Sequence, residues 1–161
     1  MKLYESRVDA SALRFGVVVS RFNHLVSVRL LEACTTELLR RGAASEDVHV
    51  AWVPGAYELP LAARALARSG RYDAIVTLGV VIRGGTPHFE FVCRGVTDGV
   101  QAVMRDTGVP VAFGVLTTDD LEQALERAGG AHGNKGAEAA LVAIEMARLA
   151  PRLSAAPESA T

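Results

Sequence analysis

The residues best suited to chemistry lie in a short glycine-containing segment. Gly84, Gly85 and Thr86 precede a predicted helix, where free backbone N–H groups and a hydroxyl can bind an anion such as phosphate. His88 stands at the start of the same helix, whose positive end favours the neutral imidazole, a form that can accept or donate a proton near neutral pH. A Gly-Gly turn beside a solvated histidine would also fit this pattern. The position of both features at the end of a predicted strand favours a functional site.

Three other segments could contribute to a site, and each also has a purely structural interpretation. Phe22 follows a predicted strand and can stack on a planar ligand or lie in the core. In the turn 54–58, small residues leave backbone amides accessible, and Glu58 can bind a polar ring edge or simply favour a helix start. Arg127 offers two parallel hydrogen bonds to a phosphate, or it completes a helix C-terminus; Lys135 adds a mobile cation.

The hydrophobic pattern alternates predicted strands and helices. Apolar runs predict strands at 14–20, 48–53, 74–81 and 111–116, and helical spacing predicts helices at 24–41, 58–69, 88–106 and 136–150. Residues 117–119 are expected to cap a further helix that ends near 127, and the glycine-containing stretch 128–135 is expected to be a loop.

This alternation requires crossover connections, which give one parallel sheet with helices on both faces. Ligands of such sheets bind at the carboxyl ends of the strands. We therefore predict an α/β fold with one domain over residues 1–150. Pro151 is expected to end the last helix and begin a mobile tail, 151–161.

The composition excludes several classes of protein. The chain has 161 residues, with 17 Lys and Arg against 18 Asp and Glu, which argues against a nucleic-acid-binding protein with a broad basic face. No apolar run is long enough to span a bilayer, and no apolar signal segment begins the chain, so we expect a cytoplasmic protein without a membrane partner. Cys34 and Cys93 lie far apart, and no residue set has metal-ligand spacing, so we expect reduced thiols and no metal site.

Five ordered strings resemble lumazine synthase (6,7-dimethyl-8-ribityllumazine synthase), the family that catalyses the penultimate step of riboflavin biosynthesis. The strings are 21–23 (RFN), 53–60 (VPGAYELP), 78–90 (LGVVIRGGTPHFE), 113–118 (FGVLTT) and, within 127–136, RAG followed by GNKG. The resemblance implies a flavodoxin-like three-layer α/β/α sandwich with a four-stranded parallel sheet. It also implies a condensation of 5-amino-6-(D-ribitylamino)uracil with 3,4-dihydroxy-2-butanone 4-phosphate, with no metal and no organic cofactor.

The resemblance further implies roles for individual residues. His88 would move protons, and Phe22 would stack on the pyrimidine ring. The phosphate would be bound by Gly85, Thr86 and Arg127, whereas Phe113 and Lys135 would come from a neighbouring subunit. The remaining substrate-binding residues would hold the pyrimidine and ribityl groups: Ala56, Tyr57, Glu58 and the backbone of Val80, Val81 and Ile82. Tyr57 stands where Phe is common in the family, and Ala131 stands where many relatives carry Lys.

The resemblance finally implies an assembly, and an alternative function remains beside it. The family builds pentamers, and the short connection 128–136 matches members whose pentamers form an icosahedral 60-mer. An association with riboflavin synthase is the implied protein partnership. The alternative is a non-catalytic flavin- or lumazine-binding relative or a shell-forming scaffold. Such a scaffold would have no use for His88, Arg127 and Lys135 together, which favours the enzyme.

Overall fold

Four parallel strands form the central sheet of the protein: β1 (Phe15–Ser20), β2 (Val48–Val53), β3 (Ala74–Ile82) and β4 (Val111–Thr118), in the order β2-β1-β3-β4. The structure is a computed structural model and describes residues 1–155. All of β1 and nearly all of β3 are buried, as strands covered on both faces should be. The predicted four-stranded parallel sheet is therefore confirmed.

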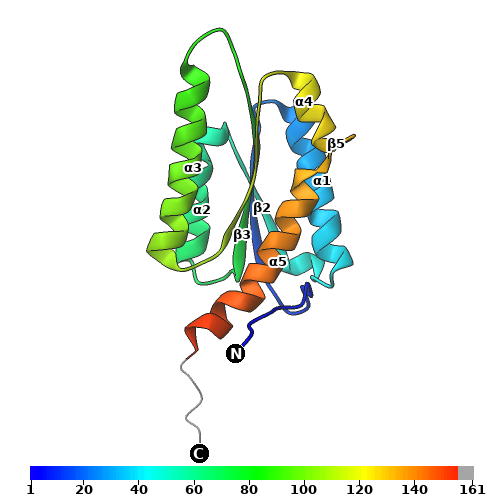
Figure 1. The fold of residues 1–161 in the computed structure, drawn as a ribbon, viewed down its shortest axis with the longest axis vertical. Helices are drawn as coiled ribbons and strands as arrows, with labels where there is room; N and C mark the ends of the chain where they lie inside the picture. The colour runs from blue at the N-terminus through cyan, green and yellow to red at the C-terminus, as the bar shows by residue number, and fades with distance from the viewer. Residues whose placement is uncertain (156–161) are drawn as a thin grey trace, which may run out of the picture.

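Two layers of helices cover the sheet (Figure 1). One layer holds α1 (His24–Arg40), α4 (Leu121–Glu126) and α5 (Lys135–Ser154), and the other holds α2 (Leu59–Arg68) and α3 (His88–Thr107). Side chains alternate between the layers along β1: Val17 and Val19 pack in the core with α1 and α5, and Val18 packs in the core with α2 and α3. This arrangement is the predicted three-layer α/β/α sandwich.

Two predictions about the chain after β4 were wrong in detail. The helix cap predicted at 117–119 lies instead at Asp120, whose carboxylate accepts the N–H of Gln123 at 2.8 Å. The reason is that β4 pairs with β3 as far as Ile82 and Thr118, which keeps 117–118 in the sheet. The predicted loop 128–135 contains a small hairpin, β5 (Ala128–Gly130) with β6 (Gly133–Asn134).

The sequence predicted that the last helix ends at Pro151, and this prediction was wrong. It continues to Ser154, with Pro151 in its final turn, where the missing N–H removes only one hydrogen bond. Arg152, beyond the proline, donates a hydrogen bond to the carbonyl of Glu5 and so ties the N-terminal segment to this turn. Residues 156–161 of the predicted mobile tail lie outside the described residues.

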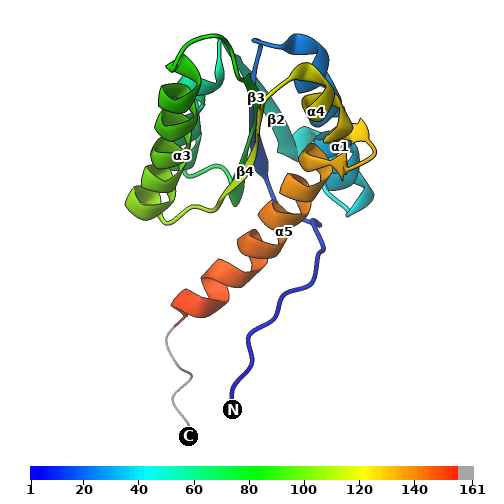
Figure 2. The ribbon, with the colours of Figure 1, turned by 45° about the horizontal axis from the view of Figure 1, so that its top comes forward.

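The N-terminal segment and the end of α5 lie at the same end of the molecule (Figure 2). The N-terminal segment runs beside the last turns of α5, where the Ser6 hydroxyl donates to the Glu145 carbonyl at 3.0 Å and Arg148 Nε donates to the Asp9 carbonyl at 3.0 Å. The carboxyl ends of the strands lie at the opposite end, where the connection between β3 and α3 forms the green arc at the top of Figure 1.

The strand order creates a crevice at those carboxyl ends. From β1 the chain passes first to β2 on one side and then, by way of α2, to β3 on the other side. In open parallel sheets, connections that leave in opposite directions open a binding crevice at this point. The segments that follow β1 and β3 therefore border the expected binding position.

Candidate functional site

A cavity of about 710 Å³ lies at the carboxyl ends of β1 and β3, within the size range of small-molecule sites. Its walls come from the segment after β1, the turn after β2, the end of β3 and the first turns of α3. The lining residues are Phe22, Gly55, Ala56, Tyr57, Glu58, Val80, Val81, Ile82, Gly84, Thr86, His88, Phe89, Phe91 and Val92. A mostly apolar wall with a few polar groups is typical of a binding site for a small organic molecule.

Phe22 is fixed at the mouth of this cavity by its backbone. The N–H of Arg21 donates to the Val53 carbonyl at 2.8 Å, and that of Phe22 donates to the Pro54 carbonyl at 3.0 Å, which continues the β1–β2 pairing beyond the strands. Asn23 then adopts a left-handed conformation with φ 58°, which turns the chain into α1. The Phe22 side chain is left 70% exposed, so it is a wall of the cavity and not a core residue.

The turn after β2 supplies a second wall through Tyr57 and Glu58. One carboxylate oxygen of Glu58 accepts the N–H of Gly55 at 3.0 Å, so this side chain stabilises the turn while it also lines the cavity. The ring of Tyr57 lies against Gly95 of α3, where an added Cβ would lie 2.5 Å from Tyr57 Cε2. The absence of a side chain at Gly95 therefore sets where this aromatic wall can lie.

The start of α3 provides further polar groups of the cavity. Thr86 and His88 line it, and Gly85 lies between Gly84 and Thr86 in the same exposed segment. Among residues 1–155, no side chain caps this end of α3, whose N-cap position is Pro87. The N–H of Glu90 donates to the Pro87 carbonyl at 3.1 Å, so the N–H groups that precede Glu90 are the ones that can bind an anion.

Four predicted site residues are not among those that line the cavity of the same chain: Gly85, which lies between two lining residues, and Phe113, Arg127 and Lys135. Phe113 lies in β4 opposite Thr77, on the part of the strand that precedes the cavity, and is 43% exposed. Arg127 donates to the Gln123 carbonyl at 3.0 Å, and Lys135 forms an ion pair with Glu138.

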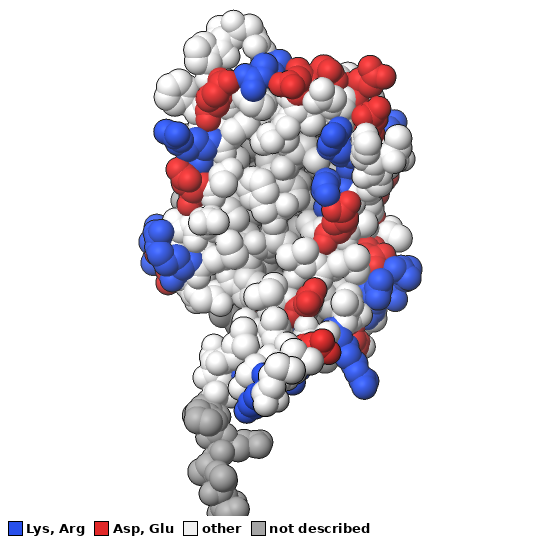
Figure 3. Space-filling view, in the orientation of Figure 1, with Lys and Arg blue, Asp and Glu red and all other residues white. Residues whose placement is uncertain are grey.

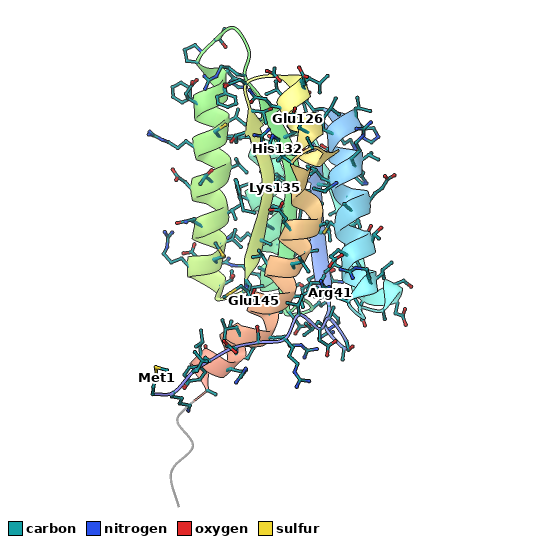
Figure 4. All side chains as sticks on the ribbon, turned by 45° about the vertical axis from the view of Figure 1, so that its right-hand side comes forward. Met1, Arg41, Glu126, His132, Lys135 and Glu145 are labelled. Carbon is teal, nitrogen blue, oxygen red and sulfur yellow. The ribbon has the colours of Figure 1, made fainter. Side chains whose placement is uncertain are left out.

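The connection from α4 to α5 gathers charged side chains in the layer opposite α2 and α3. Glu126, His132 and Lys135 lie close to one another there, beside α4 and the start of α5 and apart from α3 (Figure 4). Glu126 Oε2 lies 3.7 Å from an Arg127 guanidinium nitrogen and 3.6 Å from His132 Nε2. The cations of this connection are thus balanced by acids of the same chain.

Sequence reasoning missed several residues of the cavity. Phe91 and Val92 line it, and they follow His88 by three and four positions, the spacing that puts side chains on one helix face. The same helical spacing, counted from His88 in the sequence, would have predicted both residues. Arg83 was also missed as a charged group beside the site: its Nε donates to Asp119 Oδ1 at 2.8 Å, and its guanidinium lowers the pKa of Glu90 by a hydrogen bond.

The structure of residues 1–155 also provides observations on metal ligands, membrane-spanning helices and the two cysteines. Among residues 1–155, no three His, Cys, Asp or Glu side chains are grouped closely enough to hold a metal ion. In the same part of the chain, every helix is too short or too polar to cross a bilayer. Both cysteines are free thiols, and burial raises the pKa of Cys34 to about 12, so this side chain stays protonated at neutral pH.

A comparison with known families agrees with these observations. The family model described as 6,7-dimethyl-8-ribityllumazine synthase matches residues 12–151, which include the whole sheet, the cavity and the α4–α5 connection. The chain therefore belongs to this family of transferases, which carries out the condensation step of riboflavin biosynthesis.

Proposed function

We propose that the cavity is where this member of the 6,7-dimethyl-8-ribityllumazine synthase family joins its two substrates, with the pyrimidine on the aromatic wall and the phosphate at the start of α3. The observation that carries the proposal is the combination of features in one cavity. The exposed rings of Phe22 and Tyr57 line the same cavity as the start of α3, which has no side-chain cap among residues 1–155, and His88 lines it from the first position of that helix.

The aromatic wall suits the first substrate, 5-amino-6-(D-ribitylamino)uracil. Phe22 would stack on the flat ring and bury apolar surface in doing so. Ala56, Glu58 and the backbone of 80–82 would hold the ring edge and the ribityl hydroxyls, with Tyr57 closing the side of the cavity. Glu58 has a carboxylate oxygen beyond the one that binds the Gly55 N–H, and it can accept a further hydrogen bond.

The start of α3 suits the second substrate, 3,4-dihydroxy-2-butanone 4-phosphate. Backbone N–H groups at Gly85 and Thr86, together with the threonine hydroxyl, would bind the phosphate oxygens with help from the helix dipole. This places the ketone between the phosphate and the stacked pyrimidine. Holding two reactive molecules in that order converts a bimolecular encounter into a unimolecular one, and we expect positioning to supply most of the acceleration.

The reaction then needs mainly proton transfers. The pyrimidine amine attacks the ketone, and loss of water gives an imine. Removal of a proton drives elimination of inorganic phosphate, and the second amine closes the ring with loss of another water. His88 is the residue we assign to these transfers, because the imidazole both accepts and donates protons near neutral pH. We assign no metal and no organic cofactor to this chemistry, since both substrates are already reactive.

We further propose that Phe113, Arg127 and Lys135 complete the site of a neighbouring subunit. Support comes from their place in this chain, where they lie outside the cavity. Large apolar side chains are also exposed in two sets of elements: Phe22, Tyr57 and Phe91 at the cavity with Leu61 in α2, and Phe113, Leu121 and Val142 in β4, α4 and α5. Contact between unlike surfaces of identical subunits builds a ring when the rotation from one subunit to the next closes.

The distribution of charge is compatible with such an association. Figure 3 shows a broad uncharged band over β4, with charged side chains along α3 on one side and along α4 and α5 on the other. Together with a net charge of -1, this band favours association over mutual repulsion. The ring we propose is a pentamer, assembled into an icosahedral 60-mer, because the short α4–α5 connection resembles that of family members whose pentamers form such shells.

Two further proposals follow from family membership. The first is a cytoplasmic location, which the free thiols of Cys34 and Cys93 favour because such thiols persist in a reducing compartment. The second is an association with riboflavin synthase, which would consume the lumazine product. Co-purification of a tagged form of the chain with riboflavin synthase would test the second proposal directly.

The central test is formation of the lumazine from the two substrates. Purified protein mixed with both should produce lumazine fluorescence faster than the same mixture without protein. A non-catalytic binding relative or scaffold predicts lumazine or flavin binding without any increase in rate. Light scattering tests the assembly separately: we expect a shell-sized particle, and a particle of pentamer size would contradict the 60-mer.

A further inference from the structure

The connection between β3 and α3 has backbone hydrogen bonds at its two ends and few contacts between them. The N–H of Arg83 donates to the Thr118 carbonyl at 2.9 Å, and the N–H of Glu90 donates to the Pro87 carbonyl at 3.1 Å. Between these points residues 84–87 are exposed, and a Cβ added at Gly84 or Gly85 would meet no atom within 4 Å. In the described part of the chain no side-chain hydrogen bond involves 84–86. Glycines without packing contacts leave such a segment many conformations.

One side chain links the two ends of this segment, and it is Arg83. Its Nε donates to Asp119 Oδ1 at 2.8 Å, directly after β4, and a terminal nitrogen donates to Glu90 in the first turn of α3. The guanidinium also lies over the ring of Phe89, 4.2 Å from the ring centroid, and this ring lines the cavity. Arg83 therefore connects the end of the sheet, the start of α3 and the cavity wall.

The two carboxylates make direct attraction of a phosphate by Arg83 weak. Asp119 and Glu90 together carry more negative charge than the guanidinium carries positive charge, so the trio has no net positive charge to offer an anion. Single exposed ion pairs also contribute little to the stability of a fold. The remaining effect of the trio is geometric, because it restricts how far the start of α3 can move from the end of the sheet.

We propose that Arg83 is a positioning residue that fixes the segment 84–88 and thereby sets its affinity for a phosphate group. The inference rests on the proposed function, which places the phosphate at Gly85 and Thr86. Anion binding by backbone N–H groups requires several of them to converge on one point. A segment held by Arg83 presents them already converged, whereas a free segment must lose conformational entropy on binding.

The test is direct binding of inorganic phosphate to the full-length assembled protein, measured by calorimetry, beside the KM for each substrate. The variants are Arg83→Gln, Arg83→Lys, Glu90→Gln and Asp119→Asn. The matched control is Glu122→Gln, which removes an exposed acid of α4 that forms no ion pair within residues 1–155. All five changes are at exposed side chains, and unchanged circular dichroism and Tm would verify that the fold is intact.

Positioning and charge attraction predict opposite signs for the acidic variants. If Arg83 positions the segment, Glu90→Gln and Asp119→Asn weaken phosphate binding about twofold to threefold, although each removes a negative charge. Simple electrostatics predicts tighter binding in both, as it does for Glu122→Gln. Lysine keeps the charge but cannot make two directed bonds from one planar group, so Arg83→Lys should resemble Arg83→Gln, each about fivefold weaker.

The KM for the pyrimidine substrate and a double variant provide two further tests of the positioning role. We expect the KM for the pyrimidine substrate to change less than twofold in every variant. We expect the double variant Arg83→Gln with Asp119→Asn to bind phosphate no more weakly than Arg83→Gln alone, because the two residues act as one unit. Phosphate binding by Arg83→Lys equal to the wild type, or tighter binding by Glu90→Gln, would overturn the inference.

Failure of this inference differs from failure of the proposed function. A wild-type protein that makes no lumazine, but whose phosphate binding depends on Arg83 as described, would refute the function and leave the inference standing. A wild-type protein that makes lumazine, but whose phosphate affinity is unchanged by substitution of Arg83, would support the function and refute the inference. A wild-type protein that binds no phosphate would overturn the inference.

Discussion

The cavity at the start of α3 and the charged connection between α4 and α5 are built in opposite ways. The cavity has exposed aromatic walls and available backbone N–H groups, but its lining contains no lysine or arginine. The connection has Arg127 and Lys135, but both are already paired with acids or carbonyls of their own chain. Each region holds what the other lacks for binding a phosphorylated substrate beside a flat ring. A site formed by the two regions from different subunits would contain both parts.

The largest expected effect is on the cavity side, from His88→Ala. We expect kcat to fall about 10-fold to 100-fold while activity remains measurable, because positioning survives the loss of the proton-transferring group. Steady-state kinetics with lumazine fluorescence would measure it. Complete loss of activity with both substrates still bound would contradict a reaction that depends mainly on positioning.

The next effect is on the charged connection, from Arg127→Ala. We expect the KM for the phosphorylated substrate to rise about tenfold, with a smaller change in kcat, since a charge-assisted pair of hydrogen bonds is lost. Arg127→Lys is the control, because it keeps the charge but not the planar fork, and it should recover only part of the affinity. An unchanged KM for this substrate would remove Arg127 from the phosphate site.

Mixed assemblies test directly whether the two regions meet across a subunit contact. Co-expression of His88→Ala chains with Arg127→Ala chains places intact cavities beside intact connections at about one contact in four by random mixing. With the phosphorylated substrate well below its KM, where both single variants are strongly impaired, we therefore expect about a quarter of the wild-type activity, above either variant alone. A site built within one chain predicts no gain over the average of the two variants.

The smallest effect concerns the wall formed by Tyr57. Gly95→Ala would place a methyl group against the ring, and we expect the ring to swing aside and the KM for the pyrimidine to rise about threefold. Tyr57→Phe is the matched control, because it keeps the ring and should keep the KM. Adding Tyr57→Ala to Gly95→Ala should bring no further loss, and additive losses would contradict the contact as the cause.

The sequence predicted the sheet well because its signals are local. The apolar runs of β1 and β3 are buried on both faces, so their residues report the strand without reference to any partner. The residue that caps α4 was harder to predict, since a helix can be capped by any of four consecutive residues: Thr117, Thr118, Asp119 and Asp120. The choice among them depends on how far β4 pairs with β3, which is a property of two strands distant in sequence.

In the candidate site, too, some residues were predicted from local patterns, and others depend on contacts between distant segments. The cavity residues predicted from strand ends, such as Phe22 and Thr86, do line one cavity because the carboxyl ends of parallel strands share an edge. The contacts of Arg83 with Asp119 and Glu90 had no sequence signal, since an exposed arginine has acids within reach at many positions. The place of Arg127 relative to the cavity depends on which helical layer carries it, and local patterns do not give that.

The position of the N-terminal segment beside the end of α5 has a practical consequence for engineering. The segment that begins the chain is bonded to the last turns of α5, at the opposite end of the strands from the cavity. A protein fused at the N-terminus would therefore start far from the mouth of the cavity. A short linker from the end of α5 to the N-terminal segment, with new ends opened elsewhere in the chain, would give a circular permutant with its cavity walls unchanged.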